Sequence, residues 1–138
     1  GLTEEEAGID GDPDNDGLSN LEEATANTNP MNPDSDADTF DDGMEVVLGS
    51  NPNNAASKPT IPNPVYVDFG ADNMPHGGNL NFPFATLDDA VRHAAPGATI
   101  RIKGDVDILA GPIPAGAVSK QLTIEAFNGA VTVGNGVQ

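Results

Sequence analysis

The period of the hydrophobic pattern changes partway along the chain. From Val65 onwards, apolar residues alternate with polar ones in short runs that are separated by glycine-rich segments. A period of two predicts short β-strands that bury one face. We therefore expect strands near residues 65–68, 99–104, 105–109, 121–126 and 130–134. Their inward-facing residues are predicted to be Ile100 with Ile102, Val106 with Ile108, Leu122 with Ile124, and Val131 with Val133.

Within this β-rich part, one segment has a helical period instead. Thr86 and Asp89 have the spacing of a capping box, and Pro96 with Gly97 would end a helix that begins there. The apolar stripe of the predicted helix consists of Leu87, Ala90, Val91 and Ala94. The sequence thus places an amphipathic helix between the first two strands.

The first 58 residues contain few large apolar side chains. Burying them would contribute about 1.5–3 kcal/mol each, which does not offset the cost of ordering this segment at about 1–2 kcal/mol per residue. Two short helices are nevertheless predicted, over residues 20–26 and 42–48. Asn27 and Gly49 follow them, and both residue types tolerate the left-handed conformation of a helix C-cap. Something other than a hydrophobic core must hold this segment together.

Charge is distributed as unevenly as hydrophobicity. The chain has 22 acidic and 5 basic residues, for a formal net charge of −17. Residues 1–58 account for −14 of this charge and residues 59–138 for −3. So acidic a chain lacks the basic patch that binding to nucleic acid or to an anionic membrane requires. The absence of cysteine excludes disulfides, iron–sulfur clusters and thiolate zinc sites, and no apolar run is long enough for a membrane-spanning helix.

The acidic segment contains an internal repeat with an offset of 22 residues. At this offset the run Asp14-Asn15-Asp16 aligns with Asp36-Ala37-Asp38, and Glu23 aligns with Glu45. The aligned turn residues are Asn27/Gly49, Thr28/Ser50, Asn29/Asn51, Pro30/Pro52 and Asn32/Asn54. Repetition of this kind marks a supersecondary unit that is used more than once. Each unit is predicted to be an acidic loop, a short helix and an Asx-Pro turn.

Residues 12–23 have the ligand spacing of a twelve-residue calcium loop. Calcium takes six to eight oxygen ligands, and alternate residues of a tightly turning loop point inward. Gly17 stands at the sixth position, where the backbone must turn sharply. The predicted ligands are Asp12, Asp14, Asp16, the carbonyl of Leu18, Asn20 and Glu23.

Residues 34–45 repeat this pattern with one departure. Thr39 stands at the sixth position instead of glycine, and a positive φ at a β-branched residue costs on the order of 1–2 kcal/mol. We therefore expect the second loop to bind calcium more weakly than the first, or to bend differently. The predicted ligands are Asp34, Asp36, Asp38, the carbonyl of Phe40, Asp42 and Glu45.

A plainer interpretation is that both acidic stretches are solvated turns, but their duplication in phase with two following helices argues against it. Carboxylates held within about 4–5 Å of one another repel by several kcal/mol per pair at an effective dielectric constant near 20. The loops are thus expected to close around Ca²⁺, so that binding and folding are one event.

The segment 8–55 resembles the thrombospondin type 3 repeat in the short form found in bacterial secreted and surface proteins. The likeness rests on the run from Asp12 to Glu23, on the Thr28-Asn-Pro and Ser50-Asn-Pro turns, and on Asp34-Ser-Asp-Ala-Asp. The resemblance implies calcium held by these aspartates and an extracellular address. A dockerin has similar loop chemistry, but usually lacks the Asn-Pro turns and the closing glutamate, so it ranks lower.

The segment from Tyr66 to Gly134 resembles the opening of a right-handed parallel β-helix of the pectate-lyase-like class. The likeness rests on Pro83-Phe-Ala-Thr-Leu, on the predicted cap helix and on Pro96-Gly-Ala-Thr-Ile-Arg-Ile. A full member of this class has more coils, so an open last coil is expected to invite self-association. A small antiparallel sandwich remains an alternative, because a period of two does not distinguish the two folds.

We therefore expect a mixed fold in three parts. These are a calcium-binding acidic repeat region at residues 1–55, a proline-rich linker at 56–64 and a β-helix-like domain with an N-terminal cap helix at 65–138. The linker belongs to a stretch from Ser50 to Pro64 that contains four prolines and is expected to be extended.

The expected function is that of a non-catalytic calcium-binding module, secreted or at the cell surface, with its leader removed. Its acidic repeats would form an ion-stiffened stalk, and its β-helical part a cap or an interaction surface for an extracellular glycan or protein. His76 and His93 have no catalytic partner nearby in the sequence and are expected on the surface. The alternative is the N-terminal piece of a polysaccharide-active β-helix enzyme, a lyase or glycoside hydrolase, whose catalytic residues would lie on later coils.

Overall fold

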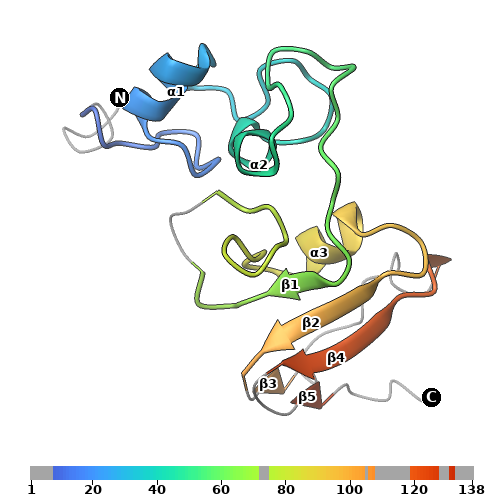
Figure 1. Cartoon of the computed structure of the whole chain (residues 1–138). Helices are drawn as coiled ribbons and strands as arrows, with labels where there is room; N and C mark the ends of the chain where they lie inside the picture. Colours follow the sequence, from blue (N-terminus) through green and yellow to red (C-terminus); the bar gives the residue numbers. More distant parts are fainter. Residues whose placement is uncertain (1–7, 72–74, 105, 108–118, 128–130, 133–138) are drawn as a thin grey trace. The chain divides into compact units, whose positions relative to one another are not determined.

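The structure is a computed structural model of the 138-residue chain, and it describes residues 8–71, 75–104, 106–107, 119–127 and 131–132 (Figure 1). The chain divides into two compact units. The first, here called the repeat unit, comprises Gly1–Thr60 and Asp72–Gly77. The second, the sheet unit, comprises Ile61–Ala71 and Gly78–Gln138.

The repeat unit contains two short helices with the bounds that the sequence predicts. Helix α1 spans Asn20–Ala26, and helix α2 spans Asp42–Leu48. Each ends at a left-handed residue, Asn27 with φ 59° and Gly49 with φ 82°. The prediction that these two residues cap the helices is therefore confirmed. The left-handed C-caps end both helices at equivalent positions of the repeat, but the helices begin differently: Ser19 forms a capping box with Glu22 at the start of α1, whereas Asp41 makes no side-chain cap hydrogen bond at the start of α2.

After each helix the chain forms the same turn. The amide of Asn29 donates to Ser35 Oγ over 3.1 Å, and the amide of Asn51 donates to Ser57 Oγ over the same distance. Residues 51–57 thus fold as a copy of residues 29–35. The expectation that the stretch from Ser50 to Pro64 is extended is wrong for this part, because the asparagine and serine side chains satisfy the backbone amides of a compact turn.

The sheet unit is built on three parallel strands. β1 (Val65–Val67), β2 (Thr99–Lys103) and β4 (Thr123–Phe127) form a sheet in the order β1-β2-β4, and Figure 1 shows β2 and β4 side by side in the same direction. Two shorter strands, β3 (Val106–Asp107) and β5 (Val131–Thr132), pair in parallel in a second sheet. Every pair among the described strands is parallel, which rules out the antiparallel sandwich for them.

The core of the sheet unit lies between the sheet and helix α3, which spans Leu87–His93. Ile100 and Ile102 of β2 are fully buried, as predicted, while Leu122 and Ile124 are half-buried. The predicted helical stripe is confirmed, since its residues Leu87, Ala90, Val91 and Ala94 are all buried. The other predicted inward residues, Val106, Ile108, Val131 and Val133, lie outside the described side chains.

Candidate metal centre

The first acidic loop is shaped by its own aspartates. Asp12 Oδ2 accepts the amide of Gly17 over 3.0 Å, and Asp16 Oδ1 accepts the amide of Leu18 over 2.8 Å. Asn15 and Gly17 have left-handed φ values of 60° and 93°. These two residues turn the backbone sharply, and the aspartate side chains hold the turn in place.

The second loop has the same conformation, residue for residue. Asp34 Oδ2 accepts the amide of Thr39 over 2.9 Å, and Asp38 Oδ1 accepts the amide of Phe40 over 3.0 Å. Ala37 and Thr39 have φ values of 61° and 84°. Of the two outcomes expected from Thr39, a different bend is therefore wrong, because this threonine adopts the strained conformation that Gly17 adopts without cost. A weaker affinity stays a prediction.

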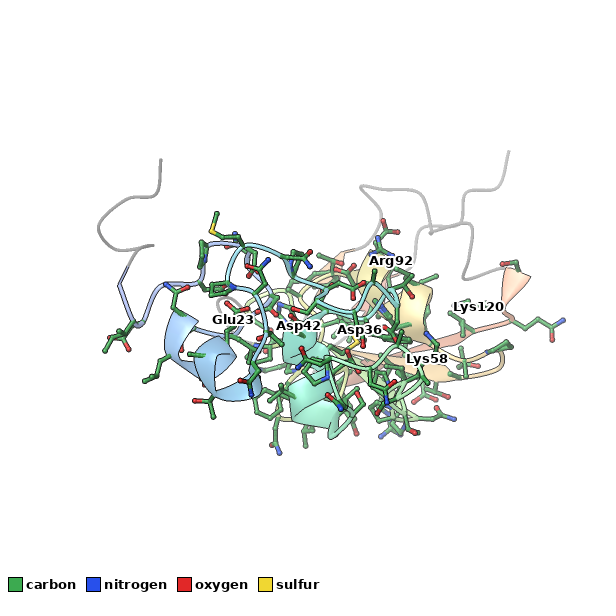
Figure 2. The ribbon with its side chains drawn as sticks, turned by 90° about the horizontal axis from the view of Figure 1, so that it is seen from above. Glu23, Asp36, Asp42, Lys58, Arg92 and Lys120 are labelled. Carbon is green, nitrogen blue, oxygen red and sulfur yellow. The ribbon has the colours of Figure 1, made fainter. Side chains whose placement is uncertain are left out.

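All of the predicted carboxylate ligands except Glu45 come together in three groups whose ligand atoms lie within 4.8 Å of one another. Two of the groups each belong to one loop, and the third joins the two repeats. Their members are Asp12, Asp14 and Asp16; Asp34, Asp36 and Asp38; and Asp16, Glu23 and Asp42. Figure 2 shows Glu23 and Asp42 close together, although they belong to different helices.

Five of the predicted carboxylate ligands are removed from solvent. Glu23, Asp42 and Glu45 are fully buried, and Asp16 and Asp38 are 4% and 7% exposed. Burying an ionised carboxylate is unfavourable unless a cation or hydrogen-bond donors compensate for its lost hydration. The repeat unit thus concentrates in its interior the side chains that proteins otherwise keep at the surface.

Hydrogen bonds supply this compensation only in part. Within the described residues, eight buried carboxylate oxygens have no hydrogen-bond partner. They belong to Asp12 and to two pairs that the 22-residue offset relates, Asp14 with Asp36 and Glu23 with Glu45. Oxygen atoms of this kind, clustered and negatively charged, suit a hard cation such as Ca²⁺. The donor set therefore fits the expected metal.

Burial also raises the affinity of these carboxylates for protons. The pKa values of Asp16, Glu23 and Glu45 are raised to about 7, chiefly by desolvation, and neighbouring carboxylates raise them further. Desolvation is also the largest cause that raises the pKa values of Asp14 and Asp42. A divalent cation at these oxygens would reverse the effect by favouring the charged form.

The predicted ligands at the ninth position differ from each other. Asp42 accepts the amide of Ser35 over 2.9 Å and its hydroxyl over 2.7 Å, while it also lies beside Asp16 and Glu23. Asn20 instead donates through Nδ2 to the carbonyl of Gly8 over 2.6 Å. Asn20 therefore ties the first loop to the segment that precedes it, whereas Asp42 closes the second loop on itself.

Several supporting contacts were not predicted from the sequence. Gly43 N donates to Asp16 Oδ2, Ser50 Oγ donates to Glu45 Oε1, and Lys58 Nζ donates to Asp38 Oδ2. Only Lys58 carried a signal in the sequence, since it is the one basic residue among the first 58. The other two contacts depend on how the loops pack against the helices.

Comparison with known families agrees with this geometry. The family model of the bacterial TSP3 repeat matches residues 12–33 and 34–55, each beginning at the first aspartate of a loop. Residues 12–55 thus match two bacterial TSP3 repeats. TSP3 repeats are of a calcium-binding type and are typical of extracellular proteins. A search of the curated proteins and a search of the solved structures found no match.

The TSP3 match covers the acidic loops, both helices of the repeat unit and both Asn-Pro turns. It does not extend to the sheet unit. In the part of the chain that the structure describes, no helix is both long and apolar enough to cross a membrane.

Proposed function

We propose that the chain is a calcium-binding, non-catalytic module of an extracellular or cell-surface protein. In this proposal residues 1–55 form an ion-stiffened stalk, residues 56–64 a linker and residues 65–138 a β-helical cap that offers an interaction surface. The observation that carries the proposal is the set of unpartnered, buried carboxylate oxygens that recur in phase in both TSP3 repeats.

Each loop would hold one calcium ion through the residues predicted from its spacing. In the first loop these are Asp12, Asp14, Asp16, the carbonyl of Leu18, Asn20 and Glu23; in the second they are Asp34, Asp36, Asp38, the carbonyl of Phe40, Asp42 and Glu45. Calcium, when bound, supplies the positive charge that these buried carboxylates need.

The same reasoning explains why the repeat unit should be rigid only with calcium. Among its described residues, the buried hydrophobic side chains are only Leu18 and Met44, whereas its buried acids include Glu23, Asp42 and Glu45. A segment with so small an apolar core gains most of its folding free energy from the metal. Calcium would therefore convert a disordered acidic segment into a stalk.

The proposal of a β-helical cap rests on the pairing of the strands. From β2 onward, successive described strands alternate between the two sheets, β2 and β4 in one and β3 and β5 in the other, and all pair in parallel. A chain that coils in one direction and places one strand in each sheet per turn produces this order. An extracellular glycan or protein is the partner class proposed for this surface.

Calorimetric titration with Ca²⁺, combined with circular dichroism in chelator, tests the calcium proposal. We expect binding heat from the wild-type chain and a gain of helical signal when calcium replaces chelator. Glu23→Gln and Glu45→Gln should each abolish binding at one loop, because a neutral amide cannot act as a bidentate anionic ligand. Glu22→Gln is the matched control, since this exposed neighbour of Glu23 carries the same charge. Identical spectra in both buffers, with no heat, would refute the proposal.

A further inference from the structure

The internal repeat continues for a few residues beyond the two TSP3 repeats. At the 22-residue offset, Ser35 aligns with Ser57, and the hydrogen bond from Asn29 N to Ser35 Oγ recurs between Asn51 N and Ser57 Oγ. The next residue in this frame is Lys58, which stands where the two repeats have Asp14 and Asp36. A third repeat thus begins in the backbone, but Ala56, Lys58 and Thr60 stand in place of the first three acids of its loop.

Lys58 reaches back to the last complete loop. Its Nζ donates to Asp38 Oδ2 over 3.0 Å and to the carbonyl of Asp38 over 3.1 Å. The Asp38 side chain is 1% exposed, whereas that of Lys58 is 54% exposed. The Nζ also lies 5.3 Å from the centre of the Phe40 ring. One lysine therefore contacts both the fifth and the seventh residues of the second loop.

Asp16 of the first loop corresponds to Asp38, but its second carboxylate oxygen has a different hydrogen-bond donor. Oδ1 of Asp16 accepts the amide of Leu18, and Oδ1 of Asp38 accepts the amide of Phe40, each within its own loop. The second oxygen of Asp16 accepts the amide of Gly43, which belongs to the helix of the following repeat. The second oxygen of Asp38 accepts the ammonium of Lys58 instead.

We propose that Lys58 is the C-terminal cap of the calcium-loop array, a tethered ammonium that holds Asp38 in place as the next repeat's amide holds Asp16. Repeat arrays need a terminal element that satisfies the surface otherwise covered by a neighbour. Glu45, fully buried and with Oε2 unpartnered, marks the same loop as a ligand site. The inference rests on the proposed calcium binding and assigns Lys58 as a positioning residue for the second loop.

The expected effect of Lys58 on calcium affinity follows from the coupling of calcium binding to folding. The structure has the contact between Lys58 and Asp38 in the closed conformation of the second loop, so we expect it to stabilise this conformation, and with it calcium binding, relative to the open chain. Removing it should weaken calcium binding at the second loop by about three- to tenfold, because the lysine side chain is half-exposed but its partner is buried. The first loop should change less, since Gly43 holds its aspartate.

Residue-resolved nuclear magnetic resonance of the full chain can separate the two loops. The amides of Gly17 and Thr39 each donate to the first aspartate of their own loop, so their shifts report calcium binding at the first and second loop respectively. Calcium is titrated into the wild-type chain and into Lys58→Met. We expect the midpoint at Thr39 to rise three- to tenfold and the midpoint at Gly17 to rise less. The difference at Thr39 should shrink as KCl increases, because salt screens an exposed ammonium.

Two further variants make the result decisive. Lys58→Gln removes the charge with a polar side chain, and it should show the same selective loss if methionine at this position causes aggregation. Lys103→Met is the matched control, because it breaks the ion pair with Asp68 in the sheet unit and changes the net charge equally; both midpoints should stay unchanged.

The proposal that Lys58 is a cap would be overturned by either of two results. One is unchanged or tighter calcium binding at the second loop, read from the Thr39 amide, in both Lys58 variants. The other is equal weakening of calcium binding at both loops, read from the Gly17 and Thr39 amides. Failure of the calcium proposal itself gives another result: the Gly17 and Thr39 amides of the wild-type chain would not respond to calcium.

Discussion

The amide of Gly43 donates a 3.0 Å hydrogen bond to Oδ2 of Asp16, and both residues are buried. Gly43 lies in α2, and Asp16 lies in the loop that precedes α1. This bond therefore ties the second repeat to the predicted calcium ligands of the first. It requires the backbone of α2 to approach the loop so closely that no side chain fits between them.

Gly43→Ala is expected to destabilise the repeat unit. A Cβ at residue 43 would overlap the carbonyl oxygen of Asp16, which is backbone and cannot move away easily. The expected loss is about 3 kcal/mol, at the upper end of the usual cost of overpacking. It would appear as a higher calcium concentration needed to induce the helical signal. Alanine ordinarily stabilises a helix relative to glycine by about 1 kcal/mol, so a stabilised variant would contradict the close approach.

Thr39→Gly is expected to strengthen calcium binding at the second loop. Thr39 has a φ of 84°, which a β-branched residue adopts only with strain, while its amide bond to Asp34 needs no side chain. Relief of the strain, less the greater freedom of glycine in the unfolded chain, should amount to about 1 kcal/mol. Two measurements report this gain in both chains: the calcium concentration at the midpoint of the shift of the residue 39 amide, and the midpoint temperature of unfolding in calcium.

Thr39→Ala serves as the control for this substitution. Alanine removes the β-branch but keeps a Cβ in the left-handed region, so it should recover less affinity than glycine does. If both variants bind calcium no better than the wild-type chain, the conformation of residue 39 does not limit binding.

Calcium binding should depend on pH near neutrality. The pKa values of Asp16, Glu23 and Glu45 are raised to about 7 in the folded, metal-free unit, from 3.8 and 4.5 for the unperturbed groups. The folded form thus binds more protons than the unfolded chain between these values, and its metal-free stability falls as the pH rises through this window. Because calcium must displace the protons, its apparent affinity rises over the same window and levels off above about pH 7.

Calorimetry in two buffers of different ionisation enthalpy measures the protons released per calcium bound. We expect clear release at about pH 6 and little at about pH 8. Glu23→Gln should reduce the number released, whereas Glu22→Gln should not, since the pKa of Glu22 is lowered by hydrogen bonds from Ser19. Calcium binding without proton release at the lower pH would contradict the raised pKa values.

Lys120→Met is expected to destabilise the sheet unit without affecting calcium binding. Lys120 Nζ donates to the carbonyls of Val91, Arg92 and Ala94 over 2.9, 2.6 and 3.0 Å, at the end of α3 where carbonyls lack helical partners. Losing these charge-assisted bonds should cost about 1–2 kcal/mol.

Thermal unfolding followed by the fluorescence of Tyr66 reports this loss, because Tyr66 is the chain's one tyrosine, lies in β1, and no tryptophan is present. Lys103→Met, which removes an exposed ion pair of the same unit, should lower the midpoint less. Equal effects of the two variants would show that Lys120 does not stabilise the end of α3.

The helices and loops of the repeat unit were predictable because their signals are local. Asn27 and Gly49 end α1 and α2 by their own backbone preferences, and alternate aspartates of each loop face inward because the loop turns at Gly17 and Thr39. Helix α3 follows from its cap and its apolar stripe in the same way. These features need no knowledge of distant residues.

The sequence by itself determined where the carboxylates stand, since their spacing and the 22-residue offset are properties of the chain. Only the tertiary structure decided what holds them. The partners Gly43 of Asp16 and Lys58 of Asp38 are 27 and 20 residues away, and the parallel pairing of β2 with β4 joins segments more than 20 residues apart. A period or a motif describes neighbours along the chain, whereas such contacts depend on the path that the backbone takes between them.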